Sequence, residues 1–309
     1  MRTIQHLLIL MISLTFAPIS GLEACSVCRC GDNAFLFSQR GFEMPGQSME
    51  SRFSLSLGNL YSNKSNILSG DEGVGTEHQR EIRPSLRMSY NITHNFSFAF
   101  ELPFQFRKIV VTTADGIGNE RSSGIGDAEI STVWMRELSE SNGRFYIGGL
   151  SLSAKVSTGR NNLLESGARL DEHLQAGSGS YDWQLGGALS RSTCASELFA
   201  SLYYRTNGTN DYRYHYGDAA LYNLGGQWPL TDWLTSSVQI NGRYASRDSD
   251  HNDVVANTGG WVTYLSPGFK VSLSRLSGVY AAVQIPIYQK LFGVQTEKAV
   301  LSTGISFQL

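Results

Sequence analysis

The chain has 309 residues and a formal net charge of -2, with a sequence pI of about 6.3. This near-neutral charge excludes the basic field with which proteins attract nucleic acid. Charged residues make up 17% of the chain, against about a quarter in typical soluble domains, while the mean hydropathy is -0.18. A chain that carries few charges without being hydrophobic is unusual for a soluble enzyme. It is expected where polar and apolar residues alternate.

The chain begins with a segment that resembles an export signal. Arg2 supplies a positive charge, residues 7–17 form an apolar stretch, and a small residue, Ala24, precedes Cys25. The apolar stretch is shorter than the ~20 residues that a membrane-spanning helix needs. We therefore predict a signal peptide at residues 1–24. No other stretch of the sequence approaches a helical span, so a mature chain that enters a membrane would cross it as strands.

Apolar and polar residues alternate from about residue 50 to the last residue. In the stretch 95–107 every even position is large and apolar, and these positions are Phe96, Phe98, Phe100, Leu102, Phe104 and Phe106. Successive side chains of a strand point to opposite faces, so this strand has one apolar face and one polar face. The pattern predicts about twelve strands, at residues 50–62, 78–91, 95–109, 124–137, 144–157, 179–192, 196–206, 212–228, 233–246, 258–273, 278–290 and 299–309.

The connections between these strands alternate in length. Long polar links are expected at 63–77, 108–123 and 158–178, and short links at 92–94, 140–143 and 193–195. Barrels of the bacterial outer membrane have short periplasmic turns and longer external loops, whereas a β-sandwich has no reason to sort its loops in this way. We predict an all-β fold, an antiparallel up-and-down transmembrane barrel of about twelve strands at residues 50–309. The alternative is an exported soluble protein with two packed sheets.

In such a barrel the phenylalanine face of residues 96–106 meets membrane lipid, and the opposite face meets a polar interior. Charged residues at the expected inward positions are Glu81, Arg83, Arg87, Glu101, Arg107, Asp127, Glu129, Lys155, Asp182, Arg205, Arg243 and Lys270. These charges could pair and fill the interior, or they could line a narrow water-filled path. Their mixed signs argue against a strong filter for anions or cations. We favour a narrow channel for the passive passage of a small polar or amphipathic solute.

Two sets of segments resemble known outer-membrane proteins. Residues 302–309 are similar to the C-terminal signal that directs barrels to the barrel-assembly machinery, except that a leucine stands where an aromatic residue is usual. A group of outer-membrane transporters that includes the phenol-degradation meta-pathway family resembles this chain at residues 25–32 (CSVCRCGD), 124–129, 155–159 and 278–289. The resemblance implies a barrel in the outer membrane and the passage of a solute, without an established substrate.

Three of the four cysteines are Cys25, Cys28 and Cys30. They lie in a Cys-rich segment, residues 25–49, which we expect to be in the periplasm. The fourth, Cys194, falls in a short connection. An even number of strands places both termini and the short turns in the periplasm, so all four thiols would share that side. They could form disulfides there, bind a soft ion such as Cu(I) or zinc, serve redox chemistry or have no role. Cys25 could also carry a lipid.

A barrel that does not conduct is the alternative function, in which the cysteine cluster holds a metal or a periplasmic partner. Enzymatic activity is not expected. A barrel phospholipase needs a serine and a histidine that are hydrogen-bonded on neighbouring strands, with an asparagine to orient the histidine. His215 comes nearest to this setting, but it lies among tyrosines and lacks the partner segments. A c-type haem is not expected, because an arginine and not a histidine follows Cys28.

Overall fold

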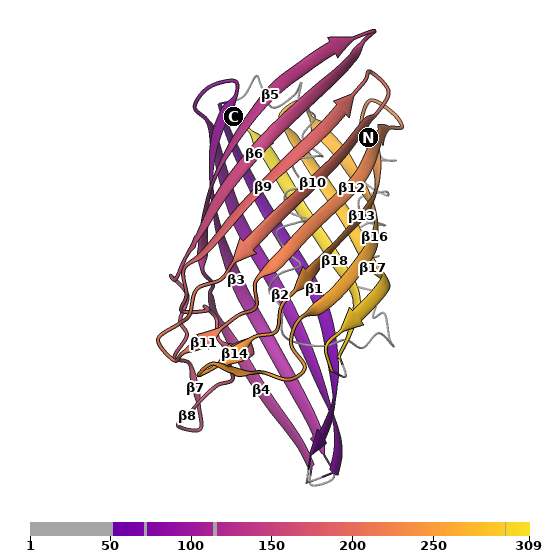
Figure 1. Cartoon of the computed structure of the whole chain (residues 1–309). Coiled ribbons are helices and arrows are strands. Elements are labelled where there is room, and N and C mark those ends of the chain that lie inside the picture. Colours follow the sequence, from indigo (N-terminus) through magenta and orange to yellow (C-terminus); the bar gives the residue numbers. More distant parts are fainter. Residues whose placement is uncertain (1–51, 71–72, 114–115, 294) are drawn as a thin grey trace.

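The computed structural model describes residues 52–70, 73–113, 116–293 and 295–309. Over these residues the chain forms a closed antiparallel barrel of 12 strands (Figure 1), and the predicted all-β barrel is confirmed. A membrane-crossing helix would have to be long and apolar, and none of the described helices meets this requirement. The expected signal peptide and Cys-rich segment lie outside the described residues.

The wall strands follow one another around the barrel in chain order. Their bounds are β1 Phe53–Gly70, β2 Gly73–Asn91, β3 Phe96–Thr113, β4 Gly116–Ile125, β5 Ala128–Ser141, β6 Arg144–Val156, β9 Asp182–Ser192, β10 Glu197–Thr206, β12 Ala219–Pro229, β13 Leu234–Ala245, β16 Gly260–Ser274, β17 Ser277–Leu291 and β18 Gln295–Gln308. Each strand pairs antiparallel with the next in this list, except that β3 pairs with both β4 and β5, and β1 pairs with β18. Closure leaves the barrel without the two free edges of an open sheet, whose backbone groups would lack partners.

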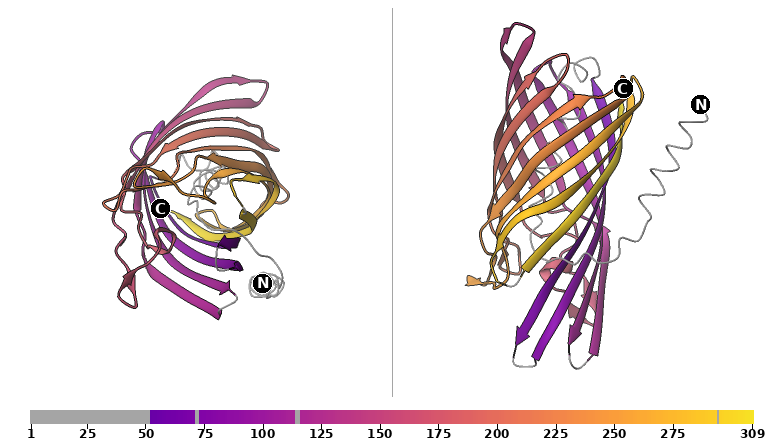
Figure 2. Two further views of the ribbon diagram at one scale, coloured as in Figure 1. Left: turned by 60° about the horizontal axis from the view of Figure 1, so that its bottom comes forward. Right: turned by 90° about the vertical axis from the view of Figure 1, so that its right-hand side faces the viewer.

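Strands β4 and β5 share one position in the wall. Both pair with β3, β4 along residues 104–113 and β5 along residues 96–101. The chain passes from one to the other at Gly126, whose N–H donates to the carbonyl oxygen of Pro103 at 2.8 Å. Strands β1 to β4 extend beyond the rest of the wall at one end of the barrel (Figure 2).

The two ends of the barrel differ in their connections. At the turn end the strands are joined by short links at residues 92–95, 142–143, 193–196, 230–233 and 275–276. At the loop end lie three longer connections, which carry the short elements β7 Leu164–Glu165, β8 Ala168–Arg169, η2 Glu172–Leu174, β11 Tyr214–His215, β14 Ser249–Asp250 and β15 Asp253–Val254. The hairpin at Asn142 and Gly143 has φ angles of 51° and 70°. Such left-handed positions favour Asn and Gly in tight hairpins.

Three of the predicted boundaries are wrong. The links expected at 63–77 and 108–123 are instead the far ends of β1 to β4, which run on as two long hairpins. The strand expected at 212–228 begins only at Ala219, since residues 207–218 form a loop. At the far ends of β1 to β4 the regular spacing of large apolar residues breaks down, so no strand period is visible there. At residues 212–216 tyrosines alternate as in a strand, although these residues lie in a loop.

A tyrosine ring packs across the seam where the barrel closes. Tyr280 of β17 reaches over Gly304 of β18 toward Gly58 of β1, and a Cβ on Gly58 would lie 3.2 Å from its hydroxyl. A side chain at Gly304 would collide with the same ring. Glycines at these two positions therefore let the ring lie flat against the inner wall of three neighbouring strands.

Candidate functional site: the barrel interior and its loop end

The pairing register shows which residues share a face of the wall. Residues directly opposite each other in an antiparallel pair point to the same side. One continuous face carries these opposite pairs: Arg87 with Glu101, Glu101 with Glu129, Glu129 with Lys155, Lys155 with Asp182, and Gln184 with Arg205. Side chains on this face touch across the barrel, as described below, so it is the inner face.

Two interior ion pairs join neighbouring strands. Arg87 of β2 contacts Glu101 of β3 with an N–O distance of 3.1 Å, and Arg107 of β3 contacts Glu81 of β2 at 3.0 Å. The Arg107 guanidinium also donates to the carbonyl oxygens of His173 and Gln175, at 3.0 and 2.8 Å. These carbonyls belong to the connection between β6 and β9. Arg107 therefore ties that connection to the inner wall.

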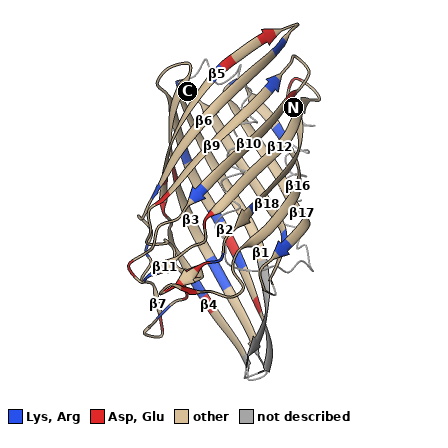
Figure 3. Cartoon of the chain, viewed as in Figure 1, with Lys and Arg blue, Asp and Glu red and all other residues tan. Residues whose placement is uncertain are grey.

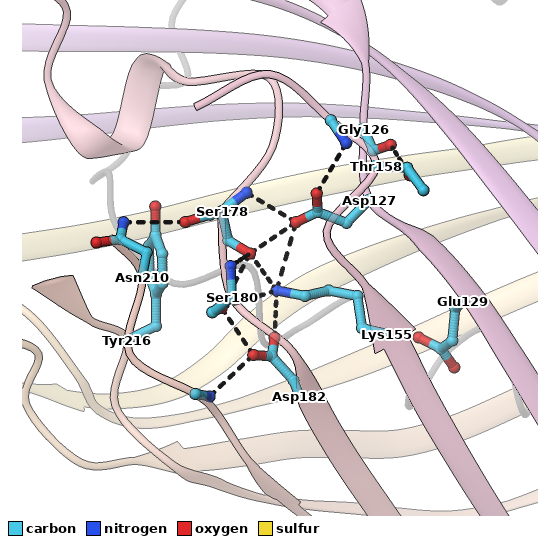
Figure 4. A network of polar contacts seen from close by, with 12 residues as sticks. Gly126, Asp127, Glu129, Lys155, Thr158, Ser178, Ser180, Asp182, Asn210 and Tyr216 are labelled. Carbon is cyan, nitrogen blue, oxygen red and sulfur yellow. Dashed lines mark hydrogen bonds and ion pairs between the residues drawn. The ribbon is translucent and has the colours of Figure 1, made fainter. Parts of the chain in front are cut away.

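A second cluster holds the same connection from the other side (Figure 4). The Lys155 ammonium lies between the carboxylates of Asp182 and Asp127, the latter at 3.4 Å. Asp127 accepts hydrogen bonds from the backbone N–H and the hydroxyl of Ser178, at 2.7 and 2.6 Å. Asp182 accepts one from Ser180 at 2.8 Å. The cluster is buried and its groups are hydrogen-bonded, which is the condition under which buried charges are stable.

Two further ion pairs cross the interior between strands that are not neighbours. Arg243 of β13 pairs with Glu297 of β18, although β16 and β17 separate these strands in the wall. One of its N–O distances is 3.2 Å, and the Tyr264 hydroxyl donates to the same carboxylate. Arg205 of β10 lies 3.9 Å from Glu129 of β5, with β6 and β9 between their strands. These contacts narrow the interior near the loop end.

The remaining predicted interior charges are Arg83 and Lys270. Arg83 lies on β2 between Glu81 and Arg87, and its charge acts on Glu101. Lys270 lies near the turn end of β16, and its Cε would be 3.3 Å from a Cβ on Gly278 of β17. Figure 3 shows that much of the middle of the wall carries no charged residue.

Three connections meet at the loop end and form a structure that we name the lid: residues 157–181, 207–218 and 246–259. The Tyr214 hydroxyl donates to Asp248 at 2.7 Å and lies 3.1 Å from the His173 ring, so it joins all three connections. Tyr216 donates to the carbonyl oxygen of Glu172 at 3.0 Å. Burial, followed by the nearby Asp248 carboxylate, raises the pKa of the Tyr214 hydroxyl above its ordinary value.

An apolar contact seats the lid on the inner wall. Leu170 and Leu174 pack against Ile109 of β3, and all three side chains are buried. Strand β3 lies far around the wall from β12 and β13, whose connections supply Tyr214 and Asp248. The first connection of the lid therefore reaches from one side of the mouth toward the other.

The outer surface of the barrel is apolar. On β9 and β10, Leu185 and Leu202 are 62% and 63% exposed, whereas their neighbours Gln184 and Tyr203 are each 3% exposed. Of the six residues of β3 that were predicted to face lipid, at the even positions from Phe96 to Phe106, four are exposed and two half-buried. Exposed aromatic residues lie near both ends: Tyr90, Trp134, Trp228 and Trp233 toward the turn end, and Trp183, Tyr204, Tyr244, Trp261 and Tyr288 toward the loop end. Membrane barrels have such aromatic girdles on either side of an apolar band.

Cys194 lies exposed in a turn-end link and forms no disulfide with another described residue, while Cys25, Cys28 and Cys30 are outside the described residues. In the part of the chain that the structure describes, no three His, Cys, Asp or Glu side chains are placed to hold a metal ion. His215 lies in β11 of the lid, not on a wall strand, with its ring 3.9 Å from Asp218.

Several residues of this site escaped the sequence-based reasoning. Glu297 faces inward because the pairing of β1 with β18 is irregular here: Ser62 is opposite Val300, but Lys64 is opposite Glu297. The extra residue in β18 shifts the alternation of inward and outward side chains along that strand. Tyr214 and Asp248 meet through loops, and no periodic signal marks such a contact. Glu197, the first residue of β10, lies on the inner face. It falls within the predicted strand 196–206 at the same alternation as Arg205, so counting every second residue back from Arg205 would have found it.

Comparison with known proteins supports the fold. No family model and no curated protein matches the sequence. Among solved structures, the chain is similar to an outer membrane channel from Pseudomonas putida, with a TM-score of 0.64, 12% identity, and coverage of 84% of this chain and 96% of that one. The translocator domain of the autotransporter NalP from Neisseria meningitidis matches with a TM-score of 0.49, 11% identity, and coverage of 90% and 97%. At 12% identity, the likeness to the Pseudomonas putida channel concerns the barrel fold alone.

Proposed function

We propose that the chain is an outer-membrane channel through which a small polar or amphipathic solute passes passively. Its loop end would face the outside of the cell, and its turn end, with both termini, the periplasm. The observation that carries the proposal is the partition of the wall: side chains alternate between an apolar outer surface and a polar inner surface, as Leu185 and Gln184 do. A bilayer demands this partition and a closed hydrogen-bonded wall. Membrane lipid and the barrel-assembly machinery are the partners that this location requires.

The dimensions of the barrel support a narrow path. A barrel of 12 strands lies between barrels of about eight strands, which side chains can fill, and porins of about sixteen, which are open. The interior ion pairs neutralise most of one another's charge, so they leave no ring of one sign that would exclude solutes by charge. The lid and the pairs Arg243–Glu297 and Arg205–Glu129 would set the narrowest part of the path.

The experiment that tests this proposal is a liposome-swelling assay with uncharged polyols of increasing size. Purified protein should speed the entry of small polyols and exclude larger ones. A variant with residues 162–174 of the lid replaced by a short Gly-Ser linker should admit larger polyols. It lacks Leu170 and Leu174, and also His173, whose carbonyl is one of the two that Arg107 binds. Liposomes with heat-denatured protein provide the control. Swelling equal to that control, for both the intact chain and the shortened lid, would contradict the channel.

The contacts across the interior favour one rival, a barrel that does not conduct. If Arg243–Glu297 and the lid seal the interior, the protein would serve as a structural or binding module, with Cys25, Cys28 and Cys30 available to a metal or to a periplasmic partner. Measuring the mass of the mature protein before and after thiol alkylation would distinguish a disulfide, a lipid and free thiols. Zinc or Cu(I) retained through purification and lost on alkylation would support the rival.

A further inference from the structure

A buried carboxylate faces the interior at the turn end of the barrel. Glu197 begins β10, directly opposite Ser192 of β9 and Gln227 of β12, and is 3% exposed. The Gln227 side-chain amide donates to it at 2.6 Å, and Ser190 is a second hydrogen-bond donor. These donors are neutral, so they orient the carboxylate without cancelling its charge.

Glu197 differs from the other interior carboxylates in having no basic partner among the described residues. The others pair as follows: Glu81 with Arg107, Glu101 with Arg87, Glu129 with Arg205, Asp127 and Asp182 with Lys155, and Glu297 with Arg243. Arg191 is near in sequence, but it lies opposite Leu198, which is exposed on the outer surface. Lys270 lies three strands away around the wall, and its side chain leans toward Gly278 on the far side.

Side-chain oxygen atoms without hydrogen-bond partners among the described residues lie on the same inner wall, and that of Ser192 is directly opposite Glu197. Those of Asn223, Ser237 and Gln239 lie on β12 and β13, farther from the carboxylate. The side-chain oxygens of Ser192, Ser237, Gln239 and Asn223 are buried and find no partner within the described part of the chain. The side chains of Gln239 and Phe199 both lie over Gly225, where a Cβ would be 2.8 Å from each of them. Buried polar atoms of a native protein normally have a hydrogen-bond partner, and leaving one without a partner is unfavourable. Water or a solute in the interior would supply it.

We propose that Glu197 and these oxygen atoms form a cation-binding site in the path, which makes the channel prefer cationic solutes. The inference rests on the proposed channel function and deepens it by naming the charge of the favoured solute. A cation beside Glu197 would supply its missing counter-charge. The Ser192 hydroxyl could contact that cation directly, and the oxygens on β12 and β13 could contact its hydrating water. The Phe199 ring adds a face that attracts organic ammonium ions more than it does hydrated inorganic ones.

The test is the zero-current potential of the protein in a planar bilayer that separates two KCl concentrations. The intact chain should show the sign expected for a preference for K⁺ over Cl⁻. Glu197→Gln, which keeps the shape and the Gln227 contact, should bring the potential close to zero while current still flows. Glu197→Asp should retain the preference. A heat-modifiable shift in gel mobility would show that each variant is a folded barrel.

The outcomes separate this inference from the proposed channel. Current without cation preference in the intact chain, or a preference that survives in Glu197→Gln, would overturn the site and leave the channel in place. A barrel that passes neither ions nor polyols would overturn both. Adding tetramethylammonium distinguishes the two kinds of cation. If it blocks the K⁺ current of the intact chain, and if Glu197→Gln and Phe199→Leu each relieve this block, the site is one for organic ammonium ions. A K⁺ preference without block would assign it to inorganic cations.

Discussion

At the scale of single residues, the lid depends on one hydroxyl group. Tyr214 is buried, donates to Asp248 and lies against His173, so three connections that are far apart in sequence meet at its oxygen atom. An ionised phenol in this place would face the Asp248 carboxylate at hydrogen-bond distance. The neutral form of Tyr214 is therefore the one that holds the lid together.

We expect the lid to loosen at alkaline pH because of this tyrosine. Since folding raises the pKa of Tyr214 above its ordinary value of 10.0, its contribution to stability is fully present below pH 10. That contribution is lost as the pH rises through the folded-state pKa. Limited proteolysis of the loop end should become faster above pH ~10 in the intact chain, and the increase should be smaller in Tyr214→Phe. Equal pH dependence in the two proteins would contradict this role.

Residue-level contacts were predictable only where strand alternation fixes the face. The interior positions of Arg87, Glu101 and Lys155 follow from counting every second residue along a regular strand. The position of Glu297 does not, because the irregularity between β1 and β18 changes the count. The partner of each charged residue depends on the register between neighbouring strands. This register cannot be read from a single sequence.

At the scale of elements, the barrel strands were foreseen because apolar side chains repeat every second residue along them. The far ends of β1 to β4 were missed for the converse reason: their apolar residues, such as Ile109, Val110 and Val111, do not fall on every second position. The alternating tyrosines at 212–216 suggested a strand, but Asn210 and Asp218 bind backbone N–H groups there and hold a loop instead. Side chains that cap loops compete with strand pairing in this way.

The first connection of the lid requires a close backbone approach. Gly177 lies against Gly159, and a Cβ on Gly177 would be 2.6 Å from the Gly159 Cα, which is backbone and cannot turn away. We expect Gly177→Ala to displace this connection at a cost of about 1–3 kcal/mol, seen as faster proteolysis within residues 157–181. Gly118→Ala is the matched control, since its Cβ would meet nothing closer than 3.9 Å. If both variants resist protease like the intact chain, the packing of the lid is not as described.

At the scale of the whole molecule, the account rests on one surface that contacts hydrocarbon and one that contacts water. Leu202 lies midway along β10 and is 63% exposed on the outer surface. We expect Leu202→Arg to destabilise the barrel in lipid by about 2–4 kcal/mol, the cost of a basic residue at the bilayer midplane. Leu202→Phe should have little effect. Reversible unfolding by denaturant in liposomes measures both, and a neutral effect of the arginine would place this surface in water.

The most direct test of the central claim, that water and solute occupy a continuous path inside the barrel, is the single-channel current of the purified protein in a planar bilayer. The account predicts discrete unit currents of uniform size, and larger units when residues 162–174 of the lid are replaced by a short linker. Folded, inserted protein that passes no current with the lid intact or shortened would contradict the claim, because the interior would then be sealed along its length.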